Sequence, residues 1–312
     1  MQDKFKIVVA TDYSPVAENA QRYAFQFAHD LNAILYLLHI YEIPFSSTPA
    51  NANEFIDTKS DYKSHELSAL EHQRGTLFNE FNFNEKEFLV ECIAKSGKTS
   101  KQIRHEAADV HADFIVLGTH GAGKFREAFL GSHTWDVIKK SGIPVIAVPE
   151  KVEFKPVKNI VFGSEFREGE IPVVNYLVHL AKRFGATLTL LHIVDTKISK
   201  PEEEKLMNDF KDQVEKDITY HLVDYRVAHY DDVVDGLNDF CLRTNADLLA
   251  MSPERSSALK LALNPTASLT RKMTFHAHVP LLAIPDYYNP DYSKFWDLFK
   301  LQKNIEINQH EY

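Results

Sequence analysis

The sequence predicts an α/β protein with two tandem domains, each a doubly wound five-stranded parallel sheet with helices on both faces. Three observations support this fold class. Short apolar runs alternate with helix-like amphipathic segments along the chain. The runs are apolar throughout, which is typical of strands that a parallel sheet buries on both faces. The second half of the chain repeats the first, and 312 residues suffice for two domains of about 150 residues.

The first half shows this alternation element by element. Lys6–Thr11 is predicted as the first strand, and Ser14 followed by Pro15 has the pattern of a helix N-cap with a first-turn proline. Apolar residues then recur at helical spacing as far as Leu31. The later elements are a second strand at 34–41, a polar loop over 44–60, a helix near 67–81, a third strand at 87–94, a helix at 101–111, and strands at 115–118 and 144–149.

An internal repeat indicates the domain organisation. KIVVATDYS from Lys6 parallels NIVFGSEFR from Asn159, and LYLLHIYE from Leu35 parallels LTLLHIVD from Leu188, both at an offset of 153 residues. Later segments repeat at offsets of 134 and 136 residues. We therefore expect one domain at 1–150, a second at 151–286, and a C-terminal tail at 287–312 with aromatic residues on one helical face.

Composition argues against several classes of function. The formal net charge of −9 disfavours a general nucleic-acid or anionic-membrane surface. The N-terminus has no signal-peptide h-region and the apolar runs are too short to span a bilayer, so the expected location is the cytoplasm. Cys92 and Cys241 have no metal or redox spacing and are expected to be inert, buried thiols. No metal site is expected, because no histidine pair has convincing spacing.

Residues 118–134, GTHGAGKFREAFLGSHT, form a glycine-rich loop between the predicted fourth strand and a helix whose N-cap is expected at Ser132. Glycines permit close approach of a bulky anion, and a helix N-terminus offers unpaired N–H groups, so the pair favours a phosphate site. An ordinary βα loop is the alternative. A Walker motif is excluded because Phe125 follows the lysine, and GxGxxG fails at Arg126.

The spacing that fits is a glycine, two residues, a glycine, nine residues, and a glycine followed by serine, at Gly118, Gly121, Gly131 and Ser132. This resembles the ATP-binding motif of the universal stress protein family, and IVVATDYSP, LLHIYE and SGIPVIAVP extend the resemblance. The resemblance implies a Rossmann-like fold of the adenine-nucleotide α-hydrolase type with strand order 3-2-1-4-5, in which the ligand lies between the first and fourth strands. It also implies that the two copies pair through their final strands as a pseudo-twofold pair.

The resemblance implies roles for the matching residues. Those expected to contact adenine and the ribose are Ala10, Thr11, Asp12, Ile40, Leu117 and Gly118. Those expected to hold the phosphates of ATP, bound with Mg²⁺, are Gly121, Gly131, Ser132, His133 and Thr134. For Asp12 the alternative is turn chemistry, because Asp is common just before a helix start.

The second copy departs from the motif. Glu165 corresponds to Asp12, and the region equivalent to the glycine loop carries Glu254 and Pro265. A carboxylate repels phosphate, and proline removes a donor N–H at a helix start. We therefore expect this domain to be structural or to bind a different ligand.

ATP binding in a regulatory or stress-response role is the function that the resemblance implies, with an unidentified regulatory protein as a further partner. Two alternatives stay open: a slow ATPase or nucleotide hydrolase that uses His120 or His133, and a binding module for a ligand other than a nucleotide. No carboxylate pair stands beside the loop to position a metal ion and water, which disfavours an ordinary hydrolase. A homodimer of the full chain, formed through other surfaces such as the aromatic tail, stays open.

Overall fold

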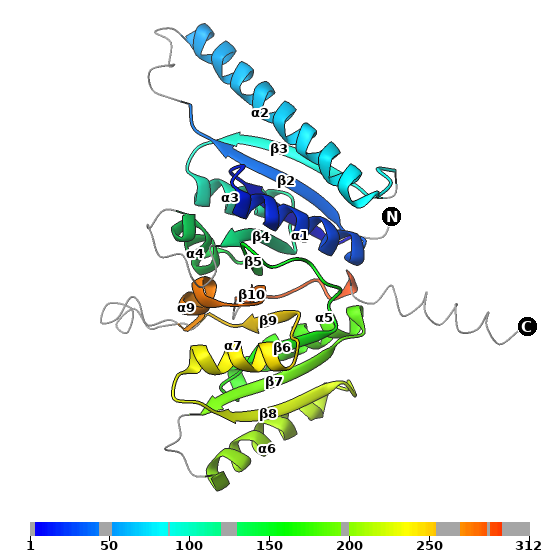
Figure 1. The fold of residues 1–312 in the computed structure, drawn as a ribbon, viewed down its shortest axis with the longest axis vertical. Helices are drawn as coiled ribbons and strands as arrows, with labels where there is room; N and C mark the ends of the chain where they lie inside the picture. The colour runs from blue at the N-terminus through cyan, green and yellow to red at the C-terminus, as the bar shows by residue number, and fades with distance from the viewer. Residues whose placement is uncertain are drawn as a thin grey trace, which may run out of the picture.

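The computed structural model of the protein describes residues 4–43, 52–86, 88–119, 130–194, 200–253, 269–285 and 288–294. Within these residues, ten strands form one continuous sheet that runs through both halves of the chain (Figure 1). Among them, no helix is both long and apolar enough to cross a bilayer.

The first half contains five strands and four helices within its described residues. They are β1 (Lys6–Thr11), α1 (Pro15–Leu31), β2 (Ile34–Tyr41), α2 (Ala52–Phe81), β3 (Val90–Ser96), α3 (Thr99–Asp109), β4 (Phe114–Thr119), α4 (Leu130–Lys140) and β5 (Val145–Pro149).

The second half repeats this series. Its described elements are β6 (Asn159–Gly163), the short 3₁₀ helix η2 (Glu168–Glu170), α5 (Ile171–Phe184), β7 (Thr187–Val194), α6 (Lys200–Asp217), β8 (Val223–His229), α7 (Val233–Arg243), β9 (Leu248–Met251), α9 (Leu269–His276) and β10 (Leu281–Ala283).

The strand order is β3-β2-β1-β4-β5-β10-β9-β6-β7-β8. Each half therefore has the predicted order 3-2-1-4-5, and all pairs inside a half are parallel. The halves join where β5 and β10 pair antiparallel, with Ile146 opposite Leu282. Because equivalent strands meet antiparallel, the two halves are related by a local twofold axis, and the predicted pseudo-twofold pair is confirmed.

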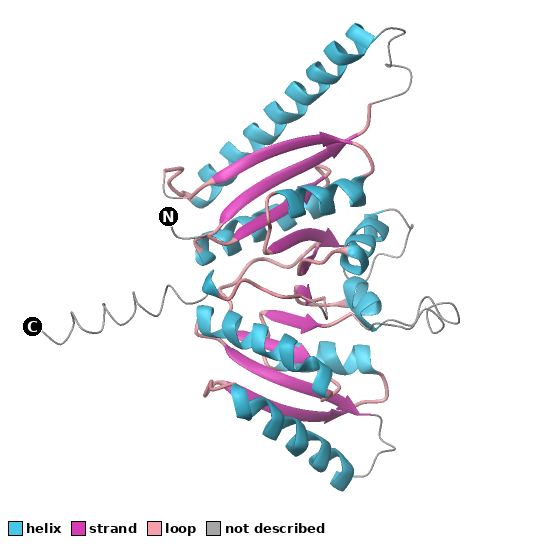
Figure 2. Cartoon of the chain, turned by 180° about the vertical axis from the view of Figure 1, so that it is seen from behind, coloured by secondary structure: helices cyan, strands magenta, loops and turns pink. Residues whose placement is uncertain are grey.

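Helices cover both faces of the sheet (Figure 2). Buried residues of α1, α2, α5 and α6 belong to one hydrophobic cluster that runs through both halves. Those of α3, α4, α7 and α9 belong to a second cluster on the other face. This arrangement buries the strands on both sides, as their continuous apolar runs predicted.

The start of α1 follows its sequence pattern. Ser14 is the N-cap residue, and its Oγ accepts a hydrogen bond from the Ala17 N–H at 3.2 Å. Pro15 lies in the first turn, where its missing N–H costs no helical hydrogen bond. At the other end Asn32 takes a left-handed conformation with a φ of 51°, a common way for a helix to stop.

Aromatic contacts join the two halves beside the paired strands. Phe27 of α1 lies 5.7 Å from Phe184 of α5 between ring centroids. Tyr23 of α1 meets Phe154, in the segment that links the halves, edge-on at 5.2 Å. These four rings extend the interface from the backbone pairing of β5 and β10 into the hydrophobic core.

Two local predictions are wrong. The loop expected over 44–60 is helical from Ala52 onward, because no proline or glycine lies between Ala52 and Arg74 and polar residues alone do not break a helix. Ser132 is not an N-cap, since α4 already includes Leu130. Residues 44–51, His120, Gly121 and the tail beyond Lys294 lie outside the described residues.

Candidate functional site

A pocket of about 240 Å³ lies at the carboxyl ends of β1 and β4. These strands are neighbours at the point where the chain order of the first half reverses, which is where doubly wound sheets bind ligands. The lining residues are Ala10, Thr11, Asp12, Ser14, Val16, Ala17, Ile40, Thr99, Ile103, Leu117, Gly118, His133 and Thr134.

Eight of the eleven predicted site residues line this pocket. They are Ala10, Thr11, Asp12, Ile40, Leu117, Gly118, His133 and Thr134. Gly131 and Ser132 lie in the first described turn of α4, directly before His133 in the chain. Gly121 lies outside the described residues.

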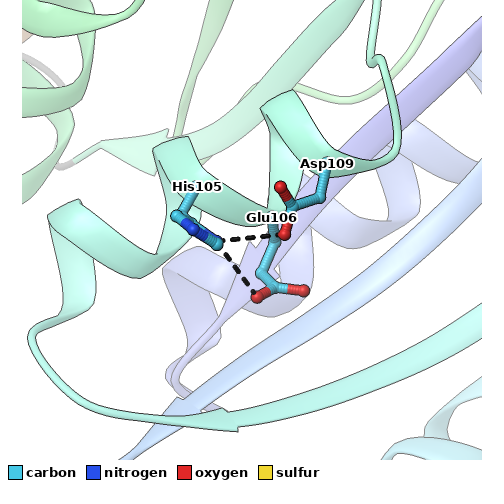
Figure 3. Close-up of side chains that lie close together, drawn as sticks. All are labelled: His105, Glu106 and Asp109. Carbon is cyan, nitrogen blue, oxygen red and sulfur yellow. Dashed lines mark ion pairs between the residues drawn. The ribbon is translucent and has the colours of Figure 1, made fainter.

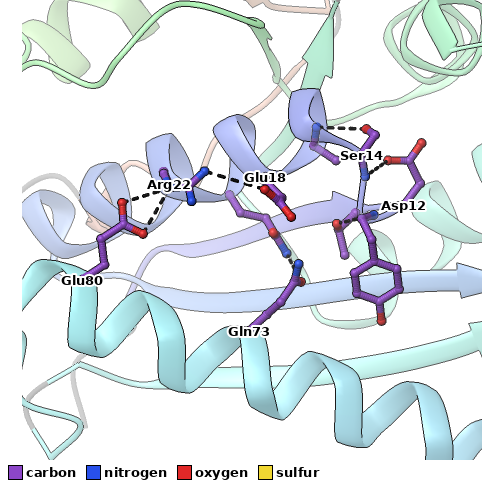
Figure 4. A network of polar contacts seen from close by, with 10 residues as sticks. Asp12, Ser14, Glu18, Arg22, Gln73 and Glu80 are labelled. Atoms are coloured by element: carbon purple, nitrogen blue, oxygen red, sulfur yellow. Dashed lines mark hydrogen bonds and ion pairs between the residues drawn. The ribbon is translucent and has the colours of Figure 1, made fainter.

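The turn after β1 is shaped by its own side chains. Asp12 Oδ1 accepts a hydrogen bond from the Ser14 N–H at 3.0 Å (Figure 4), and Thr11 Oγ1 accepts one from the Tyr13 N–H at 3.0 Å. Tyr13 has a φ of 63°, a conformation uncommon for a bulky residue. Asp12 is therefore a turn residue, as the alternative interpretation held, and its exposed side chain also lines the pocket.

Gly118 lies where β4 approaches the start of α1. A Cβ atom at this position would lie 2.6 Å from the Val16 carbonyl oxygen and 2.7 Å from Val16 Cγ1. Both distances are far shorter than van der Waals contact, and one of the atoms is backbone, so a larger residue would displace the start of α1. Packing therefore requires this glycine whether or not a ligand is bound.

Thr134 fixes α4 to the end of β4. Its Oγ1 donates a hydrogen bond to the Gly118 carbonyl oxygen at 3.1 Å, and the residue is 3% exposed. The second half repeats this contact, because Thr270 Oγ1 donates to the Ser252 carbonyl oxygen at 3.3 Å. Since the contact recurs in a half without the glycine motif, the Thr134 hydroxyl has a structural role.

The sequence interpretation missed the contribution of α3. Thr99 and Ile103, from the first two turns of α3, line the pocket, and Lys98 is the N-cap residue. Lys98 makes no side-chain cap, because an ammonium group has no acceptor for the first-turn N–H groups. The signal in the sequence was Gly97 followed by Lys, Thr and Ser, a polar run directly after a predicted strand.

The second half has a pocket of about 260 Å³ in the equivalent place. Val233 and Leu269, at the starts of α7 and α9, line this second pocket. The equivalent positions of the first pocket are lined by Thr99 and His133, at the starts of α3 and α4. Asp232 caps α7, and its Oδ1 accepts from the Val234 and Asp235 N–H groups at 2.7 and 3.1 Å.

Glu165 and Arg167, which also line this second pocket, form an ion pair with each other. The start of α3 has no side-chain cap, whereas the carboxylate of Asp232 caps the equivalent start of α7. A carboxylate there repels an anion, so the two pockets offer different chemistry despite their shared fold.

In the described part of the chain, one cluster of side chains that could bind a metal ion lies away from the pocket. His105, Glu106 and Asp109 gather on α3 (Figure 3), with His105 Nδ1 3.1 Å from Asp109 Oδ2. Lys95 Nζ lies 3.0 Å from Glu106 Oε1 and neutralises this buried carboxylate. The cluster is therefore explained as an ion-pair network, and we assign it no metal.

With this geometry established, the comparison with known families is decisive. The model of the universal stress protein family matches residues 5–149 and, a second time, residues 156–285. The chain belongs to the universal stress protein family. It carries two copies of the family's domain, as the internal repeat predicted.

Individual universal stress proteins resemble parts or all of the chain. Universal stress protein MJ0577 of Methanocaldococcus jannaschii is 28% identical over 156 residues, which covers 47% of this chain and 95% of the relative. A universal stress protein from Archaeoglobus fulgidus matches in fold with a TM-score of 0.65 and 16% identity, covering 90% of this chain and 98% of that one. A putative universal stress protein from Pseudomonas aeruginosa matches in fold with a TM-score of 0.59 and 14% identity, covering 97% of this chain and 99% of that one.

Proposed function

We propose that the pocket of the first half binds ATP and that the chain is a nucleotide-responsive regulatory protein rather than an enzyme. The bound nucleotide sets the conformation that the chain presents to a regulatory protein partner or to a second copy of itself. This universal stress protein then has one nucleotide site, in its first half.

The observation that carries the proposal is the contrast between the two pockets. In the first, the uncapped start of α3 and the first turn of α4 both adjoin the pocket, so N–H donors and positive helix-dipole ends are available to phosphates. In the second, Asp232 occupies the equivalent helix start. The same fold thus favours an anion on one side and disfavours it on the other.

The apolar lining of the pocket suits a base. Ala17, Ile40, Ile103 and Leu117 give it apolar walls that can receive the faces of a planar ring. Asp12 stands at the edge of these walls, and its carboxylate can accept a hydrogen bond from the amino group of adenine. Apolar walls for a base, together with helix N–H donors for phosphates, match the chemistry of a nucleotide.

The described residues supply little for catalysis. Asp12 is the one carboxylate among the described lining residues, and its Oδ1 already accepts from Ser14. Mg²⁺ would therefore be carried mainly by the phosphates of ATP, because the described lining residues hold no carboxylate pair to bind it and orient water. His133 lines the pocket and is exposed, which makes it the described residue to test for the alternative of slow hydrolysis.

Calorimetric titration with ATP and Mg²⁺ tests the proposal. Ile103 and Leu237 are 2% and 1% exposed and line the first and second pockets, so tryptophan at either position fills one pocket only. We expect one site per wild-type chain, loss of binding in Ile103→Trp, and unchanged binding in Leu237→Trp. Two equivalent sites, or an equal loss in both variants, would contradict the assignment.

Chromatography of nucleotides extracted from the purified chain separates the alternatives. Retained ATP that stays intact on incubation supports the regulatory proposal. Accumulation of ADP or AMP that is abolished by His133→Ala supports a slow hydrolase. A chain that retains no nucleotide and does not bind added ATP favours a different ligand.

A further inference from the structure

A contact behind the pocket joins α2 to the turn that carries Asp12. Glu66 Oε2 lies 3.5 Å from His39 Nε2 and accepts a hydrogen bond from the Tyr13 hydroxyl at 3.4 Å. The rings of His39 and Tyr13 lie 4.5 Å apart between centroids. The side chains of His39 and Glu66 are 12% and 18% exposed, so water screens this pair less than a surface ion pair.

The protonation of Tyr13 suits this contact. Burial, followed by the negative charge of Glu66, raises the pKa of the Tyr13 phenol far above its usual value. The hydroxyl therefore stays protonated and donates to the carboxylate. His65 also approaches Glu66, with its Nδ1 3.4 Å from Oε1. Its side chain is 79% exposed, so water screens this ion pair and the pair contributes little.

His39 extends the contact to the pocket wall. Its Nδ1 lies 2.8 Å from the Thr11 carbonyl oxygen, and because a carbonyl oxygen only accepts, Nδ1 carries a proton. Thr11 lines the pocket, and its Oγ1 accepts from the Tyr13 N–H. Glu66, His39 and the Thr11–Ser14 turn thus form one continuous series of contacts from α2 to the pocket.

The second half keeps the histidine, but no acidic side chain among its described residues contacts it. His192 Nδ1 lies 2.8 Å from the Ser164 carbonyl oxygen, which repeats the geometry of the first half. Phe166 replaces the tyrosine, and its ring stacks on Phe210 of α6 at 5.2 Å between centroids. The histidine-to-carbonyl contact therefore belongs to the shared fold, whereas the polar contact through Glu66 belongs to the half with the proposed nucleotide site.

Two other anchors of α2 lie further along the helix. Phe78 packs edge-on against Phe25 of α1 at 5.1 Å. Glu80 accepts from Arg22 Nε at 2.9 and 3.1 Å in an exposed ion pair (Figure 4). Neither contact involves the turn after β1, so Glu80 provides a matched control on the same helix.

We propose that Glu66 is a positioning residue for the pocket and that it couples the docking of α2 to ligand occupancy. By holding His39 and Tyr13, Glu66 keeps the Thr11–Ser14 turn in the conformation that places Asp12 at the pocket. Linkage is reciprocal, so a ligand that requires this turn also strengthens the docking of α2. The inference rests on the proposed function, because ATP is the ligand that reports the effect.

The first test compares Glu66→Gln with Glu80→Gln in the full-length chain by calorimetric titration with ATP and Mg²⁺. Glutamine keeps the size of the side chain and removes its charge. We expect Glu66→Gln to weaken ATP binding about fivefold or more, the lower end of usual coupling between linked sites. Glu80→Gln should change the affinity less than twofold, since its ion pair is exposed and remote from the turn.

The second test separates coupling from a loss of structure. In the wild-type chain, saturating ATP should slow amide hydrogen exchange in α2 around residues 60–70, and in Glu66→Gln this ligand-dependent slowing should disappear at saturation. Equal affinities for the wild-type and Glu66→Gln chains, an equal loss in both variants, or preserved slowing in Glu66→Gln would each overturn the proposal.

Amide hydrogen exchange of the nucleotide-free chain tests the role of Glu66 separately from the proposed function. If the wild-type chain bound no ATP, the proposed function would fail. The nucleotide-free chain would still report on Glu66, because Glu66→Gln should speed amide exchange in residues 11–14 while Glu80→Gln should not. Equal exchange in these two variants would then overturn the positioning role as well.

Discussion

The ammonium group of Lys294 lies 2.9 Å from Asp113 Oδ1 and 3.0 Å from Oδ2, and this pair joins the end of the described chain to the first half. Their side chains are 7% and 11% exposed. Asp113 directly precedes β4, so the pair lies at the amino ends of the strands, opposite the pocket. Asp113 Oδ2 also accepts from the Lys6 N–H at 2.8 Å.

The segment 288–294 crosses the second half on its way to this pair. Tyr288 meets Tyr176 of α5 edge-on at 5.2 Å between centroids, and Asn175 Nδ2 donates to the Tyr292 hydroxyl at 3.1 Å. One short segment therefore contacts both halves beside the β5–β10 junction. Its ion pair is shielded from water, so removing one partner would leave an uncompensated buried charge.

Lys294→Ala should lower the free energy of unfolding by about 2 kcal/mol. Removing one member of a buried pair usually costs about 3–5 kcal/mol, and here Asp113 keeps the Lys6 N–H as a partner. Urea unfolding followed by circular dichroism measures the change. Lys211→Ala, which breaks an exposed pair with Glu215, should cost less than about 0.5 kcal/mol. Equal unfolding free energies of the two variants would show that the buried pair stabilises the fold no more than the exposed pair does.

Gly118→Ala should destabilise the chain by about 1–3 kcal/mol, the usual cost of overpacking a tight contact. The added Cβ would lie 2.6 Å from the Val16 carbonyl oxygen, and backbone cannot move away as a flexible side chain can. Gly75→Ala is the control, because nothing lies within 4 Å of its Cβ position in α2, and alanine favours a helix by about 0.8–1 kcal/mol. Thermal melting should shift in opposite directions for the two variants, and a shift in the same direction would refute the packing argument.

The fold was accessible from the sequence because its main signals are local and repeated. Apolar runs marked the strands, and the offset between Lys6 and Asn159 exposed the second domain. The polar segment from Ala52 was misjudged because its composition fits a loop, yet it forms part of a long helix whose later turns pack against α1. Tertiary packing overrides a weak local preference in such cases.

The candidate site was predicted in part for the same reason. Residues within one motif, such as Gly118 and His133, could be placed together because the motif that carries the family resemblance spans both. The contribution of Thr99 and Ile103 depends on where α3 begins in space, and no motif joins that helix to the glycine loop. Contacts such as that between Glu66 and His39 depend on side-chain geometry across separate elements, which a single sequence does not carry.

Both thiols should be almost unreactive in the native chain at neutral pH. Burial, with a further contribution from Glu71, raises the pKa of Cys92 to about 12, and burial raises that of Cys241 to about 12. The reactive thiolate is therefore about a thousandfold scarcer at pH 8 than for a thiol with a pKa of 9. Ellman's reagent should react slowly, with a rate that rises about tenfold per pH unit between pH 7 and 9. Urea-unfolded chain is the control, and fast reaction of native Cys92 would contradict the burial argument.

Two substitutions at Asp12 separate its turn role from its proposed ligand role. The asparagine side chain of Asp12→Asn keeps an Oδ1 that accepts from the Ser14 N–H, so this variant should unfold with a free energy within about 0.5 kcal/mol of wild type. Asp12→Ala removes this acceptor and should cost about 1 kcal/mol, as the loss of a helix-cap hydrogen bond does.

Affinity for ATP should respond differently from stability at this position. An amide presents an N–H₂ donor where the carboxylate has its second oxygen. It therefore cannot replace the charged oxygen that accepts from the adenine amino group. A hydrogen bond to a charged group contributes about 1.5–3 kcal/mol, so both variants should bind ATP at least about tenfold more weakly. Calorimetric titration beside urea unfolding gives both quantities. If Asp12→Asn were as stable as wild type and bound ATP equally well, Asp12 would act on the turn alone, and the adenine contact would have to be assigned to the backbone of its neighbours.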